Sequence, residues 1–387
     1  MTLPPYLSTG EVNSFANLTV INRLPGIVRS VAQNNSLDAE TAGRLEQLIR
    51  TMPEYPLEPL PETSDINIRI NGEIRKNMYR WNEAPFIFVE NYLYHLLSEI
   101  MDFKNNRNDY FSFKKNEDVI INKNTIVKHI QNFDELTANK YEDALGNILH
   151  LNIFGNKADL SQLSDLRNGK LRLLIDDTEK AVNVFRAAKR VDIILDNSGE
   201  ELFFDILLAY FLLSKTETEE IGLHFKTIPY FVSDALKTDF YFLLREISTN
   251  EHGSIFSDTI HQYIKSGKLL LYDDSYWNDT DDFRNMPERI RTVFVESDLI
   301  VFKGDLNYRK LVGDRHWDFS AKTADIISYI KKNSLIVRIL KSEVITGLNA
   351  DPKNPLMNTI PDLHNKTWMY NGEYGIIQLC TVNGTEL

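Results

Sequence analysis

The stretch that decides the fold class is VDIILDNSGEELFFDILLAYFLL, at residues 191–213. It passes from an apolar run at 191–195 through Asp196 and Asn197 into a segment that is apolar on nearly every side. An Ile- and Val-rich run of that length is typical of a strand in a parallel sheet that helices cover on both faces. Ligands of such sheets bind just beyond the carboxyl ends of the strands. Asp196 and Asn197 occupy that position.

The Asp-Asn turn has two interpretations. Adjacent carboxylate and amide oxygens are ligands that Mg²⁺ or Mn²⁺ prefer over softer donors. The same Asp-Asn-Ser-Gly sequence is also a good helix N-cap, and Glu200 with Glu201 suits the positive end of the helix dipole. The turn alone does not separate the two, because a buried metal site needs a second acid from another strand.

Outward from this stretch, the chain alternates between strands and helices. Further buried-strand patterns occur at 221–228, 269–272, 299–302 and 335–340, separated mostly by helical stretches. This alternation predicts an α/β fold with a largely parallel sheet covered by helices on both faces, a three-layer arrangement. The turn at Asn371 and Gly372 precedes a last apolar run, which predicts a hairpin at the sheet edge.

The first part of the chain has a helical pattern. Apolar residues at helical spacing predict helices at 36–52 and 81–103, and further helices across 126–187. The proline-rich run at 53–61 predicts an extended connector, either a linker or a polyproline ligand for a partner. The Asn- and Lys-rich segment at 104–124 predicts a surface loop or insertion.

Composition excludes several classes of function. The 387 residues are 43% hydrophobic and 25% charged, as in ordinary globular proteins. A net charge of −12 disfavours a nucleic-acid partner, because phosphate backbones are held by clustered Lys and Arg. The single cysteine, Cys380, permits neither an internal disulfide nor a cysteine-based zinc site. Without a signal peptide or membrane span in the sequence, we expect a cytoplasmic protein with no membrane contact.

A second acid follows the next strand. PYFVSDAL at 229–236 places Asp234 in a strand-to-helix turn similar to that of Asp196. One alternative is that Ser233 or Asp234 only caps the following helix. Two acid-bearing turns at one edge of a sheet nevertheless favour a metal site.

The third strand end is basic. It reads FKGDLNYRK at 302–310, where the glycine lets the backbone approach an anion and Arg309 can grip a phosphate with two hydrogen bonds. The alternative is a capped helix with a solvated basic face. A fourth strand ends beside Arg338 and Lys341, which adds cations for a phosphorylated substrate. We therefore divide the chain into a mainly helical region at 1–187 and an α/β metal- and phosphate-binding domain at 188–387.

Known motifs of other enzyme classes are missing from the sequence. It contains no GxGxxG, GxxxxGK[ST], GxSxG or HExxH. The sequence therefore lacks the motifs of nucleotide-binding proteins, serine hydrolases and zinc proteases.

Several strings resemble one family. VDIILDNSGEELFFDILLA, TIPYFVSDAL, VFKGDLNYRKLVGD and GEYGIIQL resemble the metal-dependent damage-control phosphatases, in the branch of the acidic-residue methyltransferase 1-like proteins, subfamily III. WNEAPFIFVENYLYHLL also looks like a helix found early in that branch. The resemblance covers most of the chain, and the segment 104–124 is least accounted for.

The resemblance implies a set of site residues. Asp196, Asn197 and Asp234 match metal ligands, usually for manganese, nickel, cobalt or magnesium. The positions that match the substrate cavity are Glu201, Asp305, Leu306, Asn307, Tyr308, Arg309 and Lys341. The branch's late Arg-Thr-x-Lys motif reads Arg-Ile-Leu-Lys at 338–341, so an isoleucine replaces the threonine and leaves the role of that hydroxyl open.

We predict a divalent-metal-dependent phosphatase that hydrolyses phosphomonoesters of small metabolites. The resemblance points to sugar phosphates such as fructose 1-phosphate or fructose 6-phosphate, with Mn²⁺ or Ni²⁺ ahead of Mg²⁺ or Co²⁺. Asp196 and Asp234 would be catalytic, with Asp196 either a ligand only or also the nucleophile, and Lys303, Arg309 and Lys341 would hold the phosphate. Two alternatives stay open, an S-adenosylmethionine-dependent protein-glutamate carboxyl O-methyltransferase and a non-catalytic metabolite-binding protein.

Overall fold

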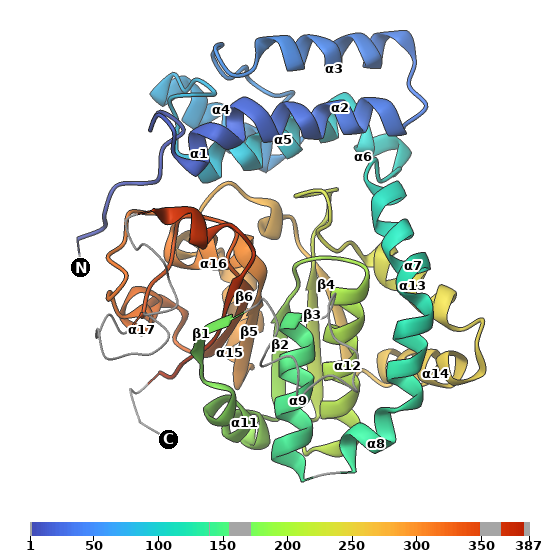
Figure 1. The fold of residues 1–387 in the computed structure, drawn as a ribbon. Helices are drawn as coiled ribbons and strands as arrows, with labels where there is room; N and C mark the ends of the chain where they lie inside the picture. Colours follow the sequence, from blue (N-terminus) through green and yellow to red (C-terminus); the bar gives the residue numbers. More distant parts are fainter. Residues whose placement is uncertain (1, 139, 155–171, 349–364, 383–387) are drawn as a thin grey trace.

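The sheet predicted from the sequence is present in the computed structural model, which describes residues 2–138, 140–154, 172–348 and 365–382 (Figure 1). Within these residues it has seven strands in the order β1-β7-β6-β5-β2-β3-β4. All neighbouring strands are parallel except β6 and β7. The strands are β1 (Arg172–Asp176), β2 (Arg190–Ile194), β3 (Glu220–Phe225), β4 (Leu269–Asp273), β5 (Leu299–Lys303), β6 (Asn333–Ile339) and β7 (Tyr374–Cys380).

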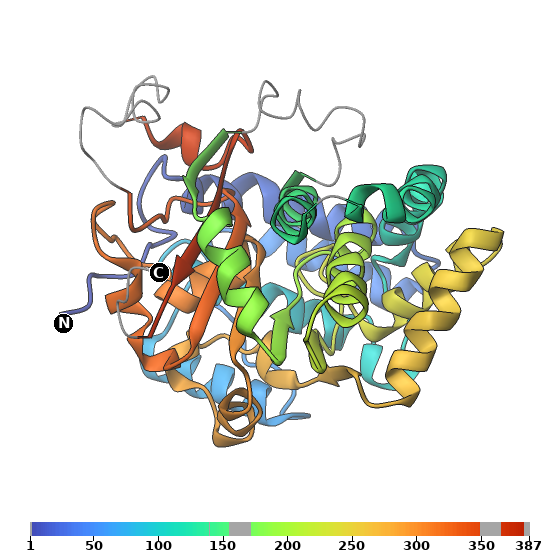
Figure 2. The same cartoon turned by 90° about the horizontal axis from the view of Figure 1, so that it is seen from below.

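Helices cover both faces of this sheet, which confirms the three-layer α/β fold (Figures 1 and 2). Alternating strand residues enter two separate cores, as Ile193 and Ile194 do on β2. One core contains α9 (Tyr141–Phe154), α11 (Thr178–Ala187), α12 (Glu200–Lys215), α13 (Lys237–Ile247) and α14 (Glu251–Lys265). The other contains α15 (Glu288–Val295), α16 (Gly304–Val312) and α17 (Thr323–Ile326), together with the short helices η4 (Ser275–Asn278) and η5 (Phe283–Asn285).

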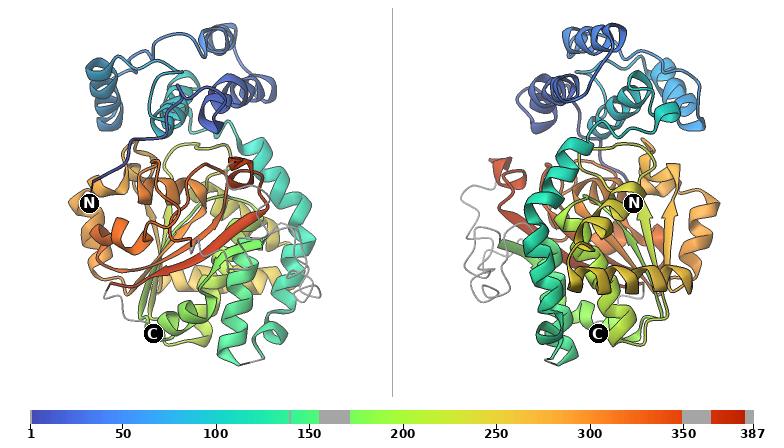
Figure 3. Two further views of the ribbon diagram at one scale, coloured as in Figure 1. Left: turned by 60° about the vertical axis from the view of Figure 1, so that its left-hand side comes forward. Right: turned by 90° about the vertical axis from the view of Figure 1, so that its right-hand side faces the viewer.

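The amino-terminal helices form a cap at one end of the sheet (Figure 3). Their core also includes Tyr230, Leu236 and Leu306, which follow β3 and β5, so the cap covers the carboxyl ends of the strands. The first segment of the chain ties the two parts together, because Leu7 N–H donates to the carbonyl of Asp314 at 3.0 Å. The cap consists of α1 (Phe15–Leu18), η1 (Thr19–Arg23), α2 (Leu24–Asn34), α3 (Ala39–Thr51), α4 (Asp65–Asn77), α5 (Phe86–Ile100) and α6 (Phe103–Asn106).

The segment 104–124 is not the predicted surface loop. Most of it belongs to the helix α7 (Ser112–Gln131). Val119 and Ile126 of α7 pack in the same core as α12, and the charged Lys115 is buried. The Asn and Lys residues that suggested a loop lie between these widely spaced core contacts, which is why the apolar pattern was weak.

The predicted helices across 126–187 are correct only in part. This range contains α8 (Phe133–Thr137), α9 and α11, but Arg172–Asp176 is the edge strand β1. The sheet therefore begins before the boundary that we predicted at 187/188, and residues 155–171 lie outside the described part of the chain.

The predicted hairpin at the sheet edge is wrong as well. β7 pairs antiparallel with β6, but it also pairs parallel with β1 and is therefore an interior strand. Its burial on both faces explains why nearly all its residues are apolar. In the described residues, no helix is both long and apolar enough to cross a bilayer.

Candidate active site

The two acid-bearing turns are held against each other by main-chain hydrogen bonds. Ser198 N–H donates to the carbonyl of Ser233 at 2.7 Å, and Ala235 N–H donates to the carbonyl of Asp196 at 2.8 Å. Because both turns follow neighbouring parallel strands, this pairing brings Asp196, Asn197 and Asp234 to one edge of the sheet. The convergence predicted from the sequence is thus present.

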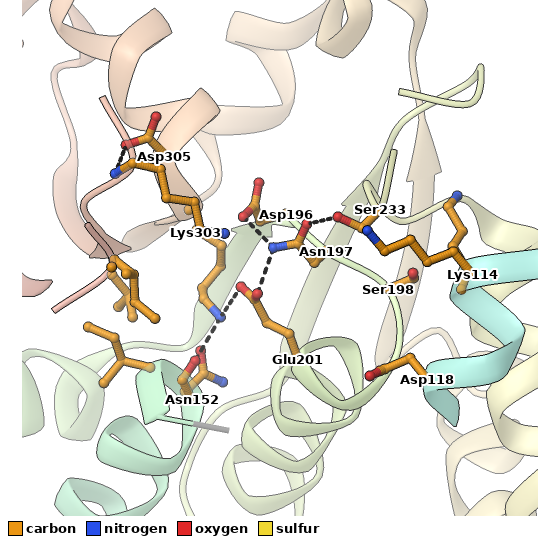
Figure 4. Close-up of a pocket in the computed structure, with 17 residues that line it drawn as sticks. Lys114, Asp118, Asn152, Asp196, Asn197, Ser198, Glu201, Ser233, Lys303 and Asp305 are labelled. Atoms are coloured by element: carbon orange, nitrogen blue, oxygen red, sulfur yellow. Dashed lines mark hydrogen bonds and ion pairs between the residues drawn. The ribbon is translucent and has the colours of Figure 1, made fainter. Parts of the chain in front are cut away.

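Asn197 is the centre of the hydrogen bonds at this edge (Figure 4). Its Nδ2 donates to Asp196 Oδ2 at 2.9 Å and to Glu201 Oε2 at 2.8 Å. Its Oδ1 accepts a hydrogen bond from Ser233 Oγ at 2.6 Å. The amide therefore separates two carboxylates that would otherwise repel each other.

Asp234 lies beneath this group rather than on the cavity surface. It is 1% exposed, and its Oδ2 is 3.3 Å from Lys226 Nζ. That oxygen accepts no hydrogen bond of good geometry from the described residues. The main-chain carbonyl of Asp234 accepts from Lys115 Nζ at 2.8 Å, which anchors the turn to α7.

Burial raises the pKa values of the two aspartates. Burial, followed by the charges of Glu201 and Asp234, raises the pKa of Asp196 well above its usual range. Burial also raises the pKa of Asp234, although Lys226 opposes this. Two buried carboxyl groups at one sheet edge are stabilised as carboxylates by an added cation, and groups with such shifted pKa values gather at functional sites.

The donor set fits a hard divalent metal. Among the described residues, no three His, Cys, Asp or Glu side chains are grouped to hold a metal, so the candidate set is two carboxylates and one amide. Asp234 Oδ2 has a free lone pair for such an ion. Asn197 presents Nδ2 to the carboxylates, and a half-turn of its amide would present Oδ1 instead.

Two lysines face these acids. Lys303 Nζ lies 2.7 Å from Asp205 Oδ1 and 3.4 Å from Glu201 Oε1. Burial lowers the pKa of Lys303, but Asp205 and Glu201 outweigh it and raise the pKa above its usual value. Burial also lowers the pKa of Lys341, but the charges of Asp196 and Glu201 outweigh burial and raise the pKa above its usual value. Both side chains are therefore cations at neutral pH.

Gly304 allows α16 to begin directly beside Asp196. Its φ is +80°, and a Cβ at this position would lie 2.0 Å from the carboxyl carbon of Asp196. Only glycine combines that conformation with so close an approach. The first turn of α16 thereby reaches the cavity, as the sequence predicted.

A cavity of about 380 Å³ joins these groups. The predicted residues that line it are Asp196, Asn197, Glu201, Lys303, Asp305 and Lys341. Figure 4 shows Asp305 and Lys303 on one side, Asp196, Asn197 and Glu201 in the centre, and Lys114 with Asp118 on the other side. Acids and cations thus face one enclosed volume.

Arg309 does not line this cavity, which corrects its predicted role as a phosphate clamp. Its guanidinium donates to both carboxylate oxygens of Asp314, at 2.8 and 2.9 Å, and to Glu90 at 2.6 Å. It is 2% exposed and has no donor directed at the cavity. Arg338 is similarly engaged by Asp305 at 2.8 Å.

Three more predicted cavity residues are structural. Leu306 packs into the core of the cap. Asn307 Nδ2 donates to the main-chain carbonyls of Leu195 at 3.0 Å and Lys303 at 2.7 Å, so it fixes the strand ends from behind. Tyr308 packs in the core beneath α16, where its hydroxyl lies 2.9 Å from Thr346 Oγ1.

The sequence missed the contribution of two helices. Lys114, Lys115 and Asp118 come from α7, and Asn152 comes from α9. Asp118 Oδ2 accepts from Glu200 N–H at 2.9 Å and so caps α12 from a distant helix. The local sequence carries no signal for such a cap, because the acceptor lies 82 residues away.

Comparison with known proteins points to one family. The sequence matches the family model of the damage-control phosphatase ARMT1-like domain over residues 19–356. Damage-control phosphatase ARMT1 of Xenopus laevis is 31% identical over 445 residues, covering 98% of this chain and 100% of the relative. The protein of the same name from Macaca fascicularis is 30% identical over 443 residues, covering 97% and 98%.

A solved DUF89 family protein from Pyrococcus horikoshii is 17% identical, with a TM-score of 0.46 over 86% of this chain and 95% of that chain, and no conclusion rests on it. The family model and the relatives decide the matter: the chain belongs to the family of the damage-control phosphatase ARMT1-like domain.

Proposed function

We propose that this protein is a divalent-metal-dependent phosphatase that hydrolyses phosphomonoesters of small metabolites. The observation that carries the proposal is the meeting of Asp196, Asn197, Glu201, Lys303 and Lys341 in one cavity. Family membership supports phosphatase chemistry, and the donor set supports the metal. A cavity of about 380 Å³ is in the usual range for a small-molecule site.

Asp196, Asn197 and Asp234 would hold the metal, which we expect to be Mn²⁺ or Ni²⁺, with Mg²⁺ or Co²⁺ as alternatives. When bound, such an ion neutralises the charge of the phosphoryl oxygens and lowers the pKa of a nucleophile. The cationic ends of Lys303 and Lys341, with the first turn of α16, would bind the remaining phosphate oxygens. Glu201 reaches both Asn197 and Lys303, so it is placed to move a proton at the reacting oxygen.

The expected substrates are sugar phosphates such as fructose 1-phosphate or fructose 6-phosphate. This choice follows from the family resemblance. No observation in the described residues favours the methyltransferase alternative, and the turn after β2 has one glycine beside two candidate metal ligands. The cytoplasmic location stays a prediction of the sequence.

Phosphate release from a panel of sugar phosphates, with each of the four metals, tests the proposal. Asp196→Ala and Asp234→Ala should each lower metal-stimulated turnover at least about 100-fold, because each removes a proposed ligand of the ion that would neutralise the phosphoryl charge. Asp258→Ala, an exposed acid on α14, is the matched control and should change nothing. Undiminished turnover in either site variant would contradict the assignment.

The role of Asp196 needs a separate experiment. If Asp196 attacks phosphorus, an aspartyl-phosphate forms and water then clears it. Borohydride added after rapid quenching reduces such an acyl phosphate and labels residue 196. An unlabelled enzyme that turns over normally assigns the attack to water and leaves Asp196 as a ligand.

A further inference from the structure

Asn152 is a buried polar side chain in the cavity that the proposed chemistry does not use. It lies on α9, lines the cavity and is 3% exposed. Neither its Nδ2 nor its Oδ1 makes a hydrogen bond of good geometry with the described residues. In Figure 4 it lies beside Lys303, on the side of the cavity away from Asp118.

An unpaired buried amide is costly. Leaving one such donor or acceptor without a partner destabilises the folded protein, and native proteins keep few of them. Burial raises the pKa of Asp205 to about 6, and a weak hydrogen-bonding interaction with the Asn152 side chain is the smallest of the effects that oppose this rise. That interaction lacks good hydrogen-bonding geometry, so a better partner for the amide is expected.

The main chain at Asn152 is fixed in place. Its carbonyl accepts a hydrogen bond from Lys303 Nζ at 3.3 Å, which ties α9 to the floor of the cavity. Because Lys303 is a candidate phosphate-binding cation, a group that contacts the amide would lie only a few atoms from the phosphate. The amide is therefore placed beside the organic part of a phosphomonoester.

The surroundings of Asn152 are aliphatic. The neighbouring lining side chains are Ile153, Val337 and Ile339. A Cβ on Gly375 would lie 3.0 Å from Ile153 Cδ1, and Gly375 pairs with Ile339 across the two strands, so the three side chains form one apolar wall. A polar group that meets this wall has the amide of Asn152 as its hydrogen-bonding partner.

We propose that Asn152 is a specificity-determining residue, whose amide binds one hydroxyl or carbonyl of the substrate close to its phosphate. The amide offers both a donor and an acceptor, which is what a hydroxyl requires. The apolar wall contacts the C–H face beside that hydroxyl. The inference rests on the proposed function and narrows its substrates to phosphates of sugars or polyols that carry a hydroxyl at this position.

Two enzymes and two kinds of substrate test the inference together. The substrates are the best sugar phosphate of the panel and its monodeoxy analogues, and the enzymes are the wild type and Asn152→Leu. For the analogue that lacks the recognised hydroxyl, kcat/KM of the wild type should be at least about 100-fold lower than for the parent. A site that hydrogen-bonds a substrate hydroxyl is left with an unpaired buried group when that hydroxyl is missing. In Asn152→Leu that preference should be at least tenfold smaller, because kcat/KM falls for the parent and stays the same for the analogue. An unchanged preference for every analogue would overturn the inference.

Stability separates recognition from a structural role. Replacing an unpaired amide with leucine removes a buried unsatisfied group, so Asn152→Leu should unfold at the same temperature as the wild type or higher. A lower unfolding temperature, with equal losses on both substrates, would also overturn the inference. Asn147→Leu, on the same helix but outside the cavity lining, is the matched control and should leave the preference unchanged.

Calorimetric binding of the same ligands in the presence of Mn²⁺ keeps the two proposals apart. If the wild type hydrolyses none of them, the proposed function fails. The ratio of the affinities for the parent and for the monodeoxy analogue still decides the role of Asn152. If the wild type binds the parent more tightly and Asn152→Leu does not, the result supports recognition by Asn152. Equal binding of all analogues contradicts it.

Discussion

The cations at the carboxyl edge of the sheet form two sets that differ in their partners. Lys303 and Lys341 face the cavity and share their charge with acids that also face it. Arg309 and Arg338 are buried behind the cavity, in hydrogen-bonded ion pairs. Residue type and position in the sequence are similar in the two sets. The surrounding packing decides which cation can meet a ligand.

The arginine set connects parts of the fold. Arg309 joins α16 to Glu90 of the cap and to Asp314, and all three side chains are buried. Arg338 joins β6 to Asp305 at the start of α16. These pairs hold the cap and α16 in place above the cavity. We therefore expect the arginines to contribute to stability and the lysines to contribute to binding.

The largest expected effect comes from breaking the arginine set. Arg309→Met leaves Asp314 buried without its ion-pair partner and leaves Glu90 with only Arg23, at 3.8 Å, so we expect the free energy of unfolding to fall by about 3–5 kcal/mol. Urea unfolding monitored by circular dichroism measures this. At a temperature where the variant is folded, KM for the phosphate substrate should stay close to that of the wild type. A stable variant with a raised KM would place Arg309 among the ligand-binding cations after all.

The next effect comes from the lysine set. Lys341→Met removes a cavity cation, and we expect kcat/KM to fall by about 100- to 1000-fold, as when one charge-stabilising donor is lost. The unfolding temperature should change little, because the acids around Lys341 lose only one of several cations. Steady-state kinetics measure the loss of kcat/KM, and thermal melts measure the change in unfolding temperature. A large loss of stability with normal kinetics would remove the distinction between the sets.

A smaller effect is the pH dependence of stability at Asp205, the partner of Lys303. Folding raises the pKa of Asp205 from 3.8 to about 6, mainly through burial. The folded protein thus holds this proton more tightly than the unfolded chain does. That stabilisation is complete below pH 3.8 and is lost as the pH rises to about 6.

Asp205→Asn keeps the shape of the side chain but cannot titrate, so it isolates this contribution. Relative to the variant, the wild type should lose unfolding free energy as the pH rises from 4 to 6 and should show a constant difference above that range. Urea midpoints at several pH values provide the measurement. A difference that is independent of pH would show that Asp205 is ionised throughout.

The sequence predicted the sheet and the centre of the site because their signals are local. Apolar runs identified β2, β3, β4, β5 and β6, and the turns after β2 and β3 identified Asp196 and Asp234. The run from Asp305 to Arg309 was less informative. Five consecutive residues cover more than one helical turn, so they cannot all face one cavity, and packing rather than sequence decides which ones do.

Other parts of the site depend on contacts between distant segments. Asp118 reaches the start of α12 from a helix whose composition resembles a loop. Asn152 and Ile153 enter the cavity only because α9 packs on α12 and β6. β1 was missed because five residues of moderate burial between helices give a weak strand signal. None of these features has a local pattern that could have predicted it.

The most direct test of the central claim is anomalous diffraction from crystals soaked in Mn²⁺. We expect one strong manganese peak bounded by Asp196, Asn197 and Asp234, with the Asn197 amide turned so that Oδ1 faces the ion. No peak there at saturating Mn²⁺, or a peak only at another acidic site such as the groove beside Glu142 and Asp176, would contradict it.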